Sequence, residues 1–200
     1  TPSQSSAASD VYKRQELSSV TDLSGVGALV VKSLSAYEWE GNSAPRLHET
    51  PNGMINSIGL QGPGLSYWME DILPQLIDKE ITVVLSIWGR TIEDYAAAAD
   101  LCSDLPTAVK AVELNISCPN VEDRGKMFSH TPASTYEVVQ ATSQIKTPRW
   151  AKLSPNVTNL VEIANAAKEA GADGVTLINT VMGMVIDLSL IHISEPTRPC

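Results

Sequence analysis

Short apolar runs alternate with longer amphipathic segments along this chain. The apolar runs predict buried strands at Gly27–Lys32, Thr82–Ile87, Ala111–Ile116, Trp150–Leu153 and Gly174–Ile178. Segments with helical spacing lie between them and predict helices at about Leu65–Ile77, Thr91–Leu101, Ser134–Ile145 and Asn159–Ala170. A repeated strand and helix order implies a parallel sheet in an α/β protein, either an open doubly wound sheet or a (β/α)8 barrel.

The helix boundaries carry local signals. Thr91 with Asp94 and Asn159 with Glu162 have the spacing of N-terminal capping pairs. Gly171 is placed to end the last helix. Pro74 should kink or end the first one, because proline has no backbone N–H to donate.

The segment between the first strand and the first helix is rich in proline and glycine. It includes Pro45, Pro51 and Gly59, and shows no strand or helix period. We expect a long irregular loop of the kind that often carries function.

Polar residues stand at or near the carboxyl ends of the predicted strands. They are Lys32, Ser86, Asn115, Lys152 and Asn179. In a barrel these strand ends meet at the rim that holds the chemistry. No Gly-x-Gly-x-x-Gly follows a strand, which disfavours a dinucleotide-binding Rossmann domain. We therefore expect the barrel and a shared ligand site at its rim.

The segment AVELNISCPN, Ala111–Asn120, concentrates reactive groups where a strand gives way to a loop. A free cysteine such as Cys118 is often a buried structural residue. Asn115 and Asn120 on either side offer amide donors and acceptors to a planar polar ligand. The thiol itself could act as a base near neutral pH if nearby cations lowered its pKa.

Composition limits the function classes. The 200 residues are 43% hydrophobic and 18% charged, which suits one globular domain. The net charge of −9 argues against a nucleic-acid partner. Three cysteines show neither metal spacing nor a disulfide framework, and no apolar run is long enough to span a membrane. We expect a cytoplasmic protein without a metal site.

Segments near both ends of the chain can be encoded by the same DNA sequence, read on opposite strands. GATGTGTATAAGAGACAG encodes Asp10–Gln15, and its reverse complement encodes Leu188–Ile193. This DNA sequence resembles a transposon end used in sequencing adapters. Residues 1–15 and 188–200 are therefore interpreted as adapter-like and non-native, and residues 16–187 as the natural part, a fragment.

The run ELNISCPN, Glu113–Asn120, resembles the active-site segment of class 1 dihydroorotate dehydrogenases, in particular the NAD-linked 1B type. VKSLS, NGMINSIGLQGPG, AKLSPNVT and LINTVMG resemble further segments of that family. The resemblance implies that residues 16–187 are a partial FMN-binding TIM barrel holding about strands 2 to 6. A chain without the remaining strands is expected to bind flavin poorly and to be inactive by itself.

The same resemblance assigns site residues. It implies Cys118 as the catalytic base, and FMN contacts from Lys32, Ser33, Ser86, Asn115, Lys152 and Ile178. Substrate contacts would come from Lys32, Asn56, Ser57, Ile58, Gly59, Leu60, Asn115, Asn120, Asn179 and Thr180. Ser86 departs from 1B members with asparagine there, while serine resembles other class 1 members.

The implied activity is oxidation of (S)-dihydroorotate to orotate in pyrimidine biosynthesis. The implied assembly is a homodimer core with an electron-transfer subunit that carries FAD and a 2Fe-2S cluster. Two alternatives stay open: a dihydropyrimidine dehydrogenase-like flavin reductase of uracil or thymine, and a truncated product without function.

Overall fold

The computed structural model describes residues 25–50, 53–117 and 127–186. Segments 1–15 and 188–200, interpreted above as non-native, lie outside the described residues, as do Cys118 and Asn120.

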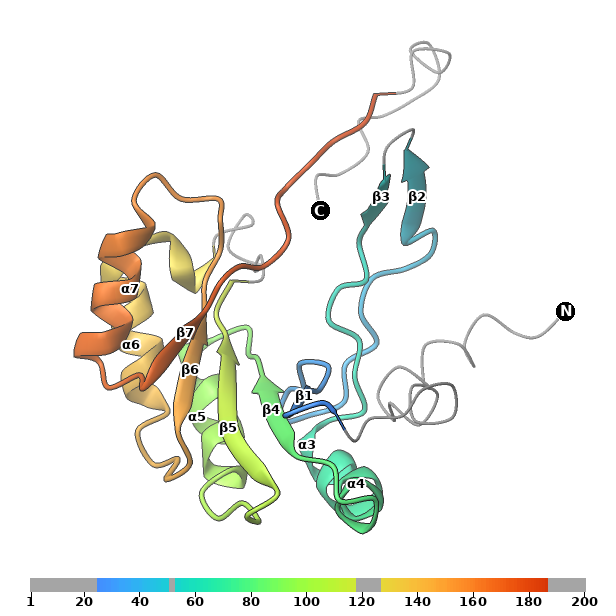
Figure 1. Ribbon diagram of the computed structural model, residues 1–200. Helices are drawn as coiled ribbons and strands as arrows, with labels where there is room; N and C mark the ends of the chain where they lie inside the picture. Colours follow the sequence, from blue (N-terminus) through green and yellow to red (C-terminus); the bar gives the residue numbers. More distant parts are fainter. Residues whose placement is uncertain (1–24, 51–52, 118–126, 187–200) are drawn as a thin grey trace, which may run out of the picture.

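The centre of the structure is a five-stranded parallel sheet in the order β1-β4-β5-β6-β7. Its strands are β1 (Leu29–Val30), β4 (Val83–Ile87), β5 (Val109–Asn115), β6 (Arg149–Lys152) and β7 (Gly174–Thr176). The strands follow one another in sequence order, and α5, α6 and α7 lie on one side of the sheet (Figure 1). A doubly wound sheet would reverse its order and carry helices on both faces. The expected partial (β/α)8 barrel is therefore confirmed.

Two of the predicted helices have the expected caps. In α5 (Ile92–Leu101), the Thr91 hydroxyl accepts a hydrogen bond from the Asp94 backbone N–H, and the Asp94 side chain accepts from the Thr91 N–H. In α7 (Leu160–Glu169), the Asn159 side chain accepts from the Glu162 N–H.

Helix α6 (Pro132–Ala141) begins before the predicted start at Ser134 and ends before the predicted end at Ile145. Its N-cap is Thr131, whose hydroxyl accepts from the Ser134 N–H, and Pro132 occupies the first turn. Proline is favoured there because its fixed φ suits a helix start and its missing N–H has no helical partner. A short 3-10 turn, η2 (Phe128–His130), precedes it.

The first predicted helix is continuous but irregular. It consists of α3 (Leu65–Tyr67), a π-type turn η1 (Trp68–Ile72) and α4 (Leu73–Asp78). Pro74 lies in the first turn of α4, directly after the wider π turn. The helix thus changes its hydrogen-bond pattern before the proline and does not end there. No helix in residues 25–50, 53–117 and 127–186 is long and apolar enough to cross a membrane.

The expected irregular loop contains regular structure. Strands β2 (Leu47–Thr50) and β3 (Gly53–Asn56) form an antiparallel hairpin outside the main sheet (Figure 1). Most of the hairpin residues are exposed, so no buried apolar face marks these strands in the sequence. The prediction of a loop without strands was wrong for this part.

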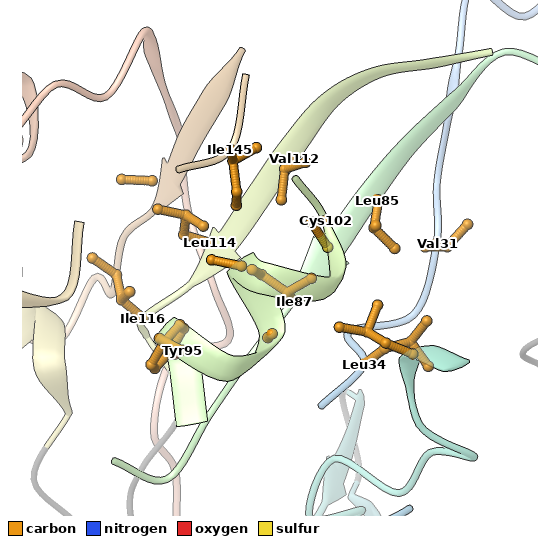
Figure 2. Close-up of a cluster of buried hydrophobic side chains, with 14 of the residues drawn as sticks. Val31, Leu34, Leu85, Ile87, Tyr95, Cys102, Val112, Leu114, Ile116 and Ile145 are labelled. Carbon is orange, nitrogen blue, oxygen red and sulfur yellow. The ribbon is translucent and has the colours of Figure 1, made fainter. Parts of the chain in front are cut away.

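Alternation along the strands separates a core face from a polar face. Leu85, Ile87, Val112 and Leu114 point into the apolar core against the helices (Figure 2). The residues between them, Ser86 and Glu113 among them, therefore face the other side of the sheet. That opposite side, which is the interior of the barrel segment, holds the polar groups described next.

Candidate active site

A cavity of about 350 Å³ lies at the carboxyl ends of the strands. Most of the predicted site residues line it: Lys32, Ser33, Asn56, Ile58, Gly59, Leu60, Asn115, Lys152, Asn179 and Thr180. These residues come from segments more than a hundred positions apart in the sequence. Lys32, Asn115 and Lys152 converge because the carboxyl ends of parallel strands share one edge of the sheet, whereas Asn56 and residues 58–60 reach the cavity from the end of β3 and the loop after it.

Three predicted contact residues are not among the residues that line this cavity. Ser86 is 1% exposed and lies behind the wall, bonded to other wall residues. The Ser57 carbonyl and hydroxyl both accept hydrogen bonds from the Asn42 side chain. Ile178 follows β7 and is half exposed. Cys118 and Asn120, outside the described residues, receive no placement.

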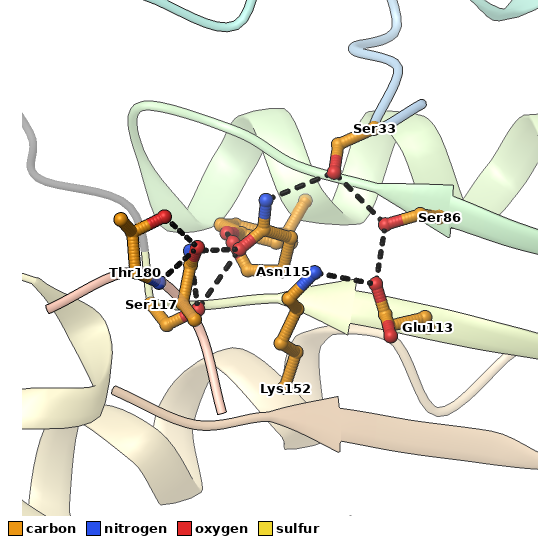
Figure 3. A network of polar contacts seen from close by, with 9 residues as sticks. Ser33, Ser86, Glu113, Asn115, Ser117, Lys152 and Thr180 are labelled. Carbon is orange, nitrogen blue, oxygen red and sulfur yellow. Dashed lines mark hydrogen bonds and ion pairs between the residues drawn. The ribbon is translucent and has the colours of Figure 1, made fainter. Parts of the chain in front are cut away.

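Glu113 also lines the cavity, and the sequence reasoning did not select it. It is a carboxylate at 1% exposure, and the Lys152 ammonium lies 3.5 Å from its Oε1 (Figure 3). A buried charge requires such a partner. The Lys152 ammonium therefore offsets part of the cost of burying the Glu113 carboxylate. The signal was present in the strand alternation, which places Glu113 two residues before Asn115 on the same face.

Sheet register brings this polar group together. Ser86 pairs with Glu113 across β4 and β5, and Asn115 pairs with Lys152 across β5 and β6. Ser86 donates a hydrogen bond to Glu113 Oε1 at 2.9 Å, and its hydroxyl lies 2.9 Å from that of Ser33. Asn115 Nδ2 in turn donates to the Ser33 hydroxyl at 2.9 Å. One chain of hydrogen bonds therefore crosses three strand ends (Figure 3).

The Asn115 amide is held from its other side as well. Its Oδ1 accepts from the Ser117 hydroxyl at 3.0 Å and from Asn179 Nδ2 at 3.4 Å. The Tyr95 hydroxyl donates to the Asn115 backbone carbonyl at 2.7 Å. Asn179 Oδ1 accepts from the Thr180 N–H at 2.8 Å. The side-chain amide most central to the site thus has a defined orientation.

The loop that forms another wall of the cavity is fixed to the preceding segment. The Trp39 indole N–H donates to the Gly59 carbonyl at 2.9 Å, and the backbones of Trp39 and Gly62 exchange two hydrogen bonds. The Asn42 N–H donates to the Ile58 carbonyl at 3.1 Å. Gly59 has φ +73°, a left-handed conformation that favours glycine. The wall is therefore pre-formed.

This site suits a planar ligand with a polar edge. The amides of Asn56, Asn115 and Asn179 offer both donors and acceptors. Val30, Val31, Ile58 and Leu60 add apolar wall area. Lys32 and Lys152 bring two ammonium groups to the wall, which suits an electron-rich ligand. These are the features that a flavin ring and a pyrimidine require, so the residues fit the cofactor that the sequence resemblance implied.

Comparisons with known proteins identify the family of the chain. The family model described as dihydroorotate dehydrogenase matches residues 6–197. The chain is 43% identical over 174 residues to the dihydroorotate dehydrogenase B (NAD(+)) catalytic subunit of Bacteroides thetaiotaomicron, covering 86% of this chain and 57% of the relative. It is 46% identical over 176 residues to the same subunit of Geotalea uraniireducens, covering 87% and 57%. The chain therefore spans little more than half the length of these relatives.

A solved structure shares the fold. The crystal structure of the Eimeria tenella dihydroorotate dehydrogenase in complex with ferulenol superposes with a TM-score of 0.61 at 17% identity. The superposition covers 82% of this chain and 52% of that one. With a sequence identity of 17%, this structural similarity supports the barrel architecture alone.

Proposed function

The chain belongs to the dihydroorotate dehydrogenase family, and on that premise we propose that the full-length protein oxidises (S)-dihydroorotate to orotate in pyrimidine biosynthesis. The observation that carries the proposal is the cavity itself. Ten residues chosen from the sequence for cofactor or substrate contact line one space at the barrel rim.

FMN is the proposed cofactor. Lys32, Ser33, Asn115 and Lys152 would hold it, with Ser86 supporting Ser33 from behind the wall. When bound, FMN supplies the hydride acceptor that the oxidation needs. The lysine ammonium groups would stabilise the negative charge that a flavin gains on reduction.

The protein residues bind the substrate and remove its proton. Asn56, Asn115 and Asn179 offer amide groups to the alternating N–H and C=O edge of the pyrimidine ring. Backbone N–H groups of the loop at residues 58–60 would receive the carboxylate of dihydroorotate, because the Ser57 N–H already donates to the Arg46 carbonyl. Cys118 would accept the proton from C5 as the hydride leaves C6, which requires the thiolate form.

The relatives named as catalytic subunits of the B type suggest a second subunit for electron transfer to NAD. We propose that this subunit carries the FAD and 2Fe-2S groups, that the catalytic subunit forms a homodimer core, and that the enzyme is cytoplasmic.

The test uses the full-length protein, recovered from the source DNA by reading outward past both ends of this sequence. It is assayed for flavin-dependent turnover of dihydroorotate and, separately, for reduction of uracil. We expect orotate formation and no turnover of uracil. Uracil reduction without dihydroorotate oxidation would contradict the proposal and favour a pyrimidine reductase.

A further inference from the structure

A chain of hydrogen bonds links Asn115, Ser33, Ser86 and Glu113 behind the cavity wall. Glu113 determines which group donates and which accepts in each of these bonds. An ionised carboxylate only accepts hydrogen bonds, so the Ser86 hydroxyl must donate its single proton to Glu113 Oε1. Ser86 can then only accept from Ser33, 2.9 Å away. Ser33, its proton used, must accept from Asn115, and the group within 2.9 Å is Nδ2.

We propose that Glu113 is a positioning residue that fixes the orientation of the Asn115 amide through Ser86 and Ser33. With Nδ2 held by Ser33, Asn115 Oδ1 is turned toward Ser117 and Asn179 (Figure 3). Without this chain a carboxamide could rotate by half a turn and exchange its donor and acceptor. Together with the Asn179 Nδ2 donor on the other side of the amide, Glu113 thereby fixes which hydrogen-bonding pattern Asn115 presents to a ligand.

Burial makes this control strong. Ser33, Ser86, Glu113 and Asn115 are each less than 7% exposed, so water does not compete for their hydrogen bonds. The contact with the Lys152 ammonium at 3.5 Å supplies the counter-charge that a buried carboxylate requires. If the donors and acceptors of these hydrogen bonds were reversed, the Ser86 hydroxyl oxygen would face Glu113 Oε1 without a proton between them. Two buried acceptors would then lie against each other, which is costly.

The identity of the ligand in this inference rests on the proposed function. The hydrogen bonds of the Asn115 amide, however, can be measured without any ligand. The full-length protein is labelled with 15N asparagine, and the Asn115 side-chain signals are assigned by their loss in Asn115→Asp. Exchange of these amide protons with solvent is then measured in the wild type, Ser86→Ala and Glu113→Gln. Ser86→Ala interrupts the chain, and Glu113→Gln replaces the acceptor with a group of the same shape that can also donate.

Thr142→Ala is the matched control. Its hydroxyl is buried and hydrogen-bonded, donating to the Val139 carbonyl at 2.9 Å at the end of α6, away from the cavity. Like Ser86→Ala, the Thr142→Ala substitution removes one buried hydroxyl. It should therefore lower the free energy of unfolding to a similar degree, without acting on Asn115.

We expect slow exchange in the wild type and in Thr142→Ala, and faster exchange in both Ser86→Ala and Glu113→Gln. The affinity for orotate should fall about three- to tenfold in Ser86→Ala, the range of one hydrogen bond, and at least as much in Glu113→Gln. Unchanged Asn115 exchange in both variants would overturn the inference. If exchange responds but the wild type does not bind orotate, the positioning role stands and the proposed function fails.

Discussion

Gly59→Ala tests whether the loop wall of the cavity is held rigidly. A Cβ built at Gly59 would lie 2.6 Å from the Asn42 backbone nitrogen and 2.6 Å from Asn42 Cγ, well inside contact distance. The backbone nitrogen cannot move aside without losing its 3.1 Å hydrogen bond to the Ile58 carbonyl. The positive φ of +73° adds strain for any residue with a Cβ.

The magnitude follows from these two terms. A left-handed conformation costs an alanine about 1–2 kcal/mol, and the lost backbone hydrogen bond costs about 1 kcal/mol. We therefore expect Gly59→Ala to lower the free energy of unfolding by about 2–3 kcal/mol. Because the displaced loop forms part of the cavity, orotate should also bind at least about tenfold more weakly, which corresponds to about 1.4 kcal/mol.

Gly53→Ala is the control for this experiment. Gly53 lies in β3, and among the residues that the structure describes a Cβ there would meet only the Thr50 hydroxyl at 3.8 Å, an ordinary contact. Denaturant unfolding and orotate titration of the full-length protein are compared for both variants. If Gly59→Ala behaves like Gly53→Ala in both measurements, the account of a pre-formed loop wall is refuted.

Two further predictions concern the scaffold. Asn159→Ala should lower the free energy of unfolding by about 1 kcal/mol, because α7 loses its N-cap; Asn165→Ala, at an exposed interior position of the same helix, should be neutral or slightly stabilising. Equal destabilisation by both would contradict the capping role. Burial raises the pKa of the Cys102 thiol from 9.0 to about 12, so the native protein should protect Cys102 from alkylation at pH 8, as read by peptide mass spectrometry. The folded state binds the thiol proton more tightly than the unfolded state, so stability should fall as the pH rises from about 9 toward 12. Alkylation of Cys102 at the rate of a free thiol would contradict its burial.

Periodicity and capping chemistry were enough to predict most of the scaffold. The central strands β4 and β5 are almost fully buried, and their apolar runs carry that signal in the sequence. The caps at Thr91 and Asn159 depend on residues three positions apart, so they too can be read locally. Convergence of the polar strand ends followed from parallel topology.

Features that depend on contacts between strands could not be predicted in this way. Alternation along β5 puts Glu113 on the same face as Asn115, but its contacts with Ser86 and Lys152 depend on sheet register, which no local pattern specifies. The hairpin β2–β3 has mostly exposed residues, so its sequence lacks the apolar alternation that marks a strand. Helix α6 was placed too late because the Thr131–Pro132 start was not recognised.

The proposed oxidation of dihydroorotate with Cys118 as the base can be tested in a single turnover. The most direct test mixes the oxidised, full-length protein with dihydroorotate without oxygen and follows the loss of oxidised flavin absorbance in a single turnover, for the wild type and Cys118→Ala. We expect rapid reduction in the wild type, and reduction slowed by at least about a hundredfold in Cys118→Ala, with bound flavin and orotate affinity retained. Equal rates in the two proteins would contradict the assignment of the base, and no reduction in the wild type would contradict the function.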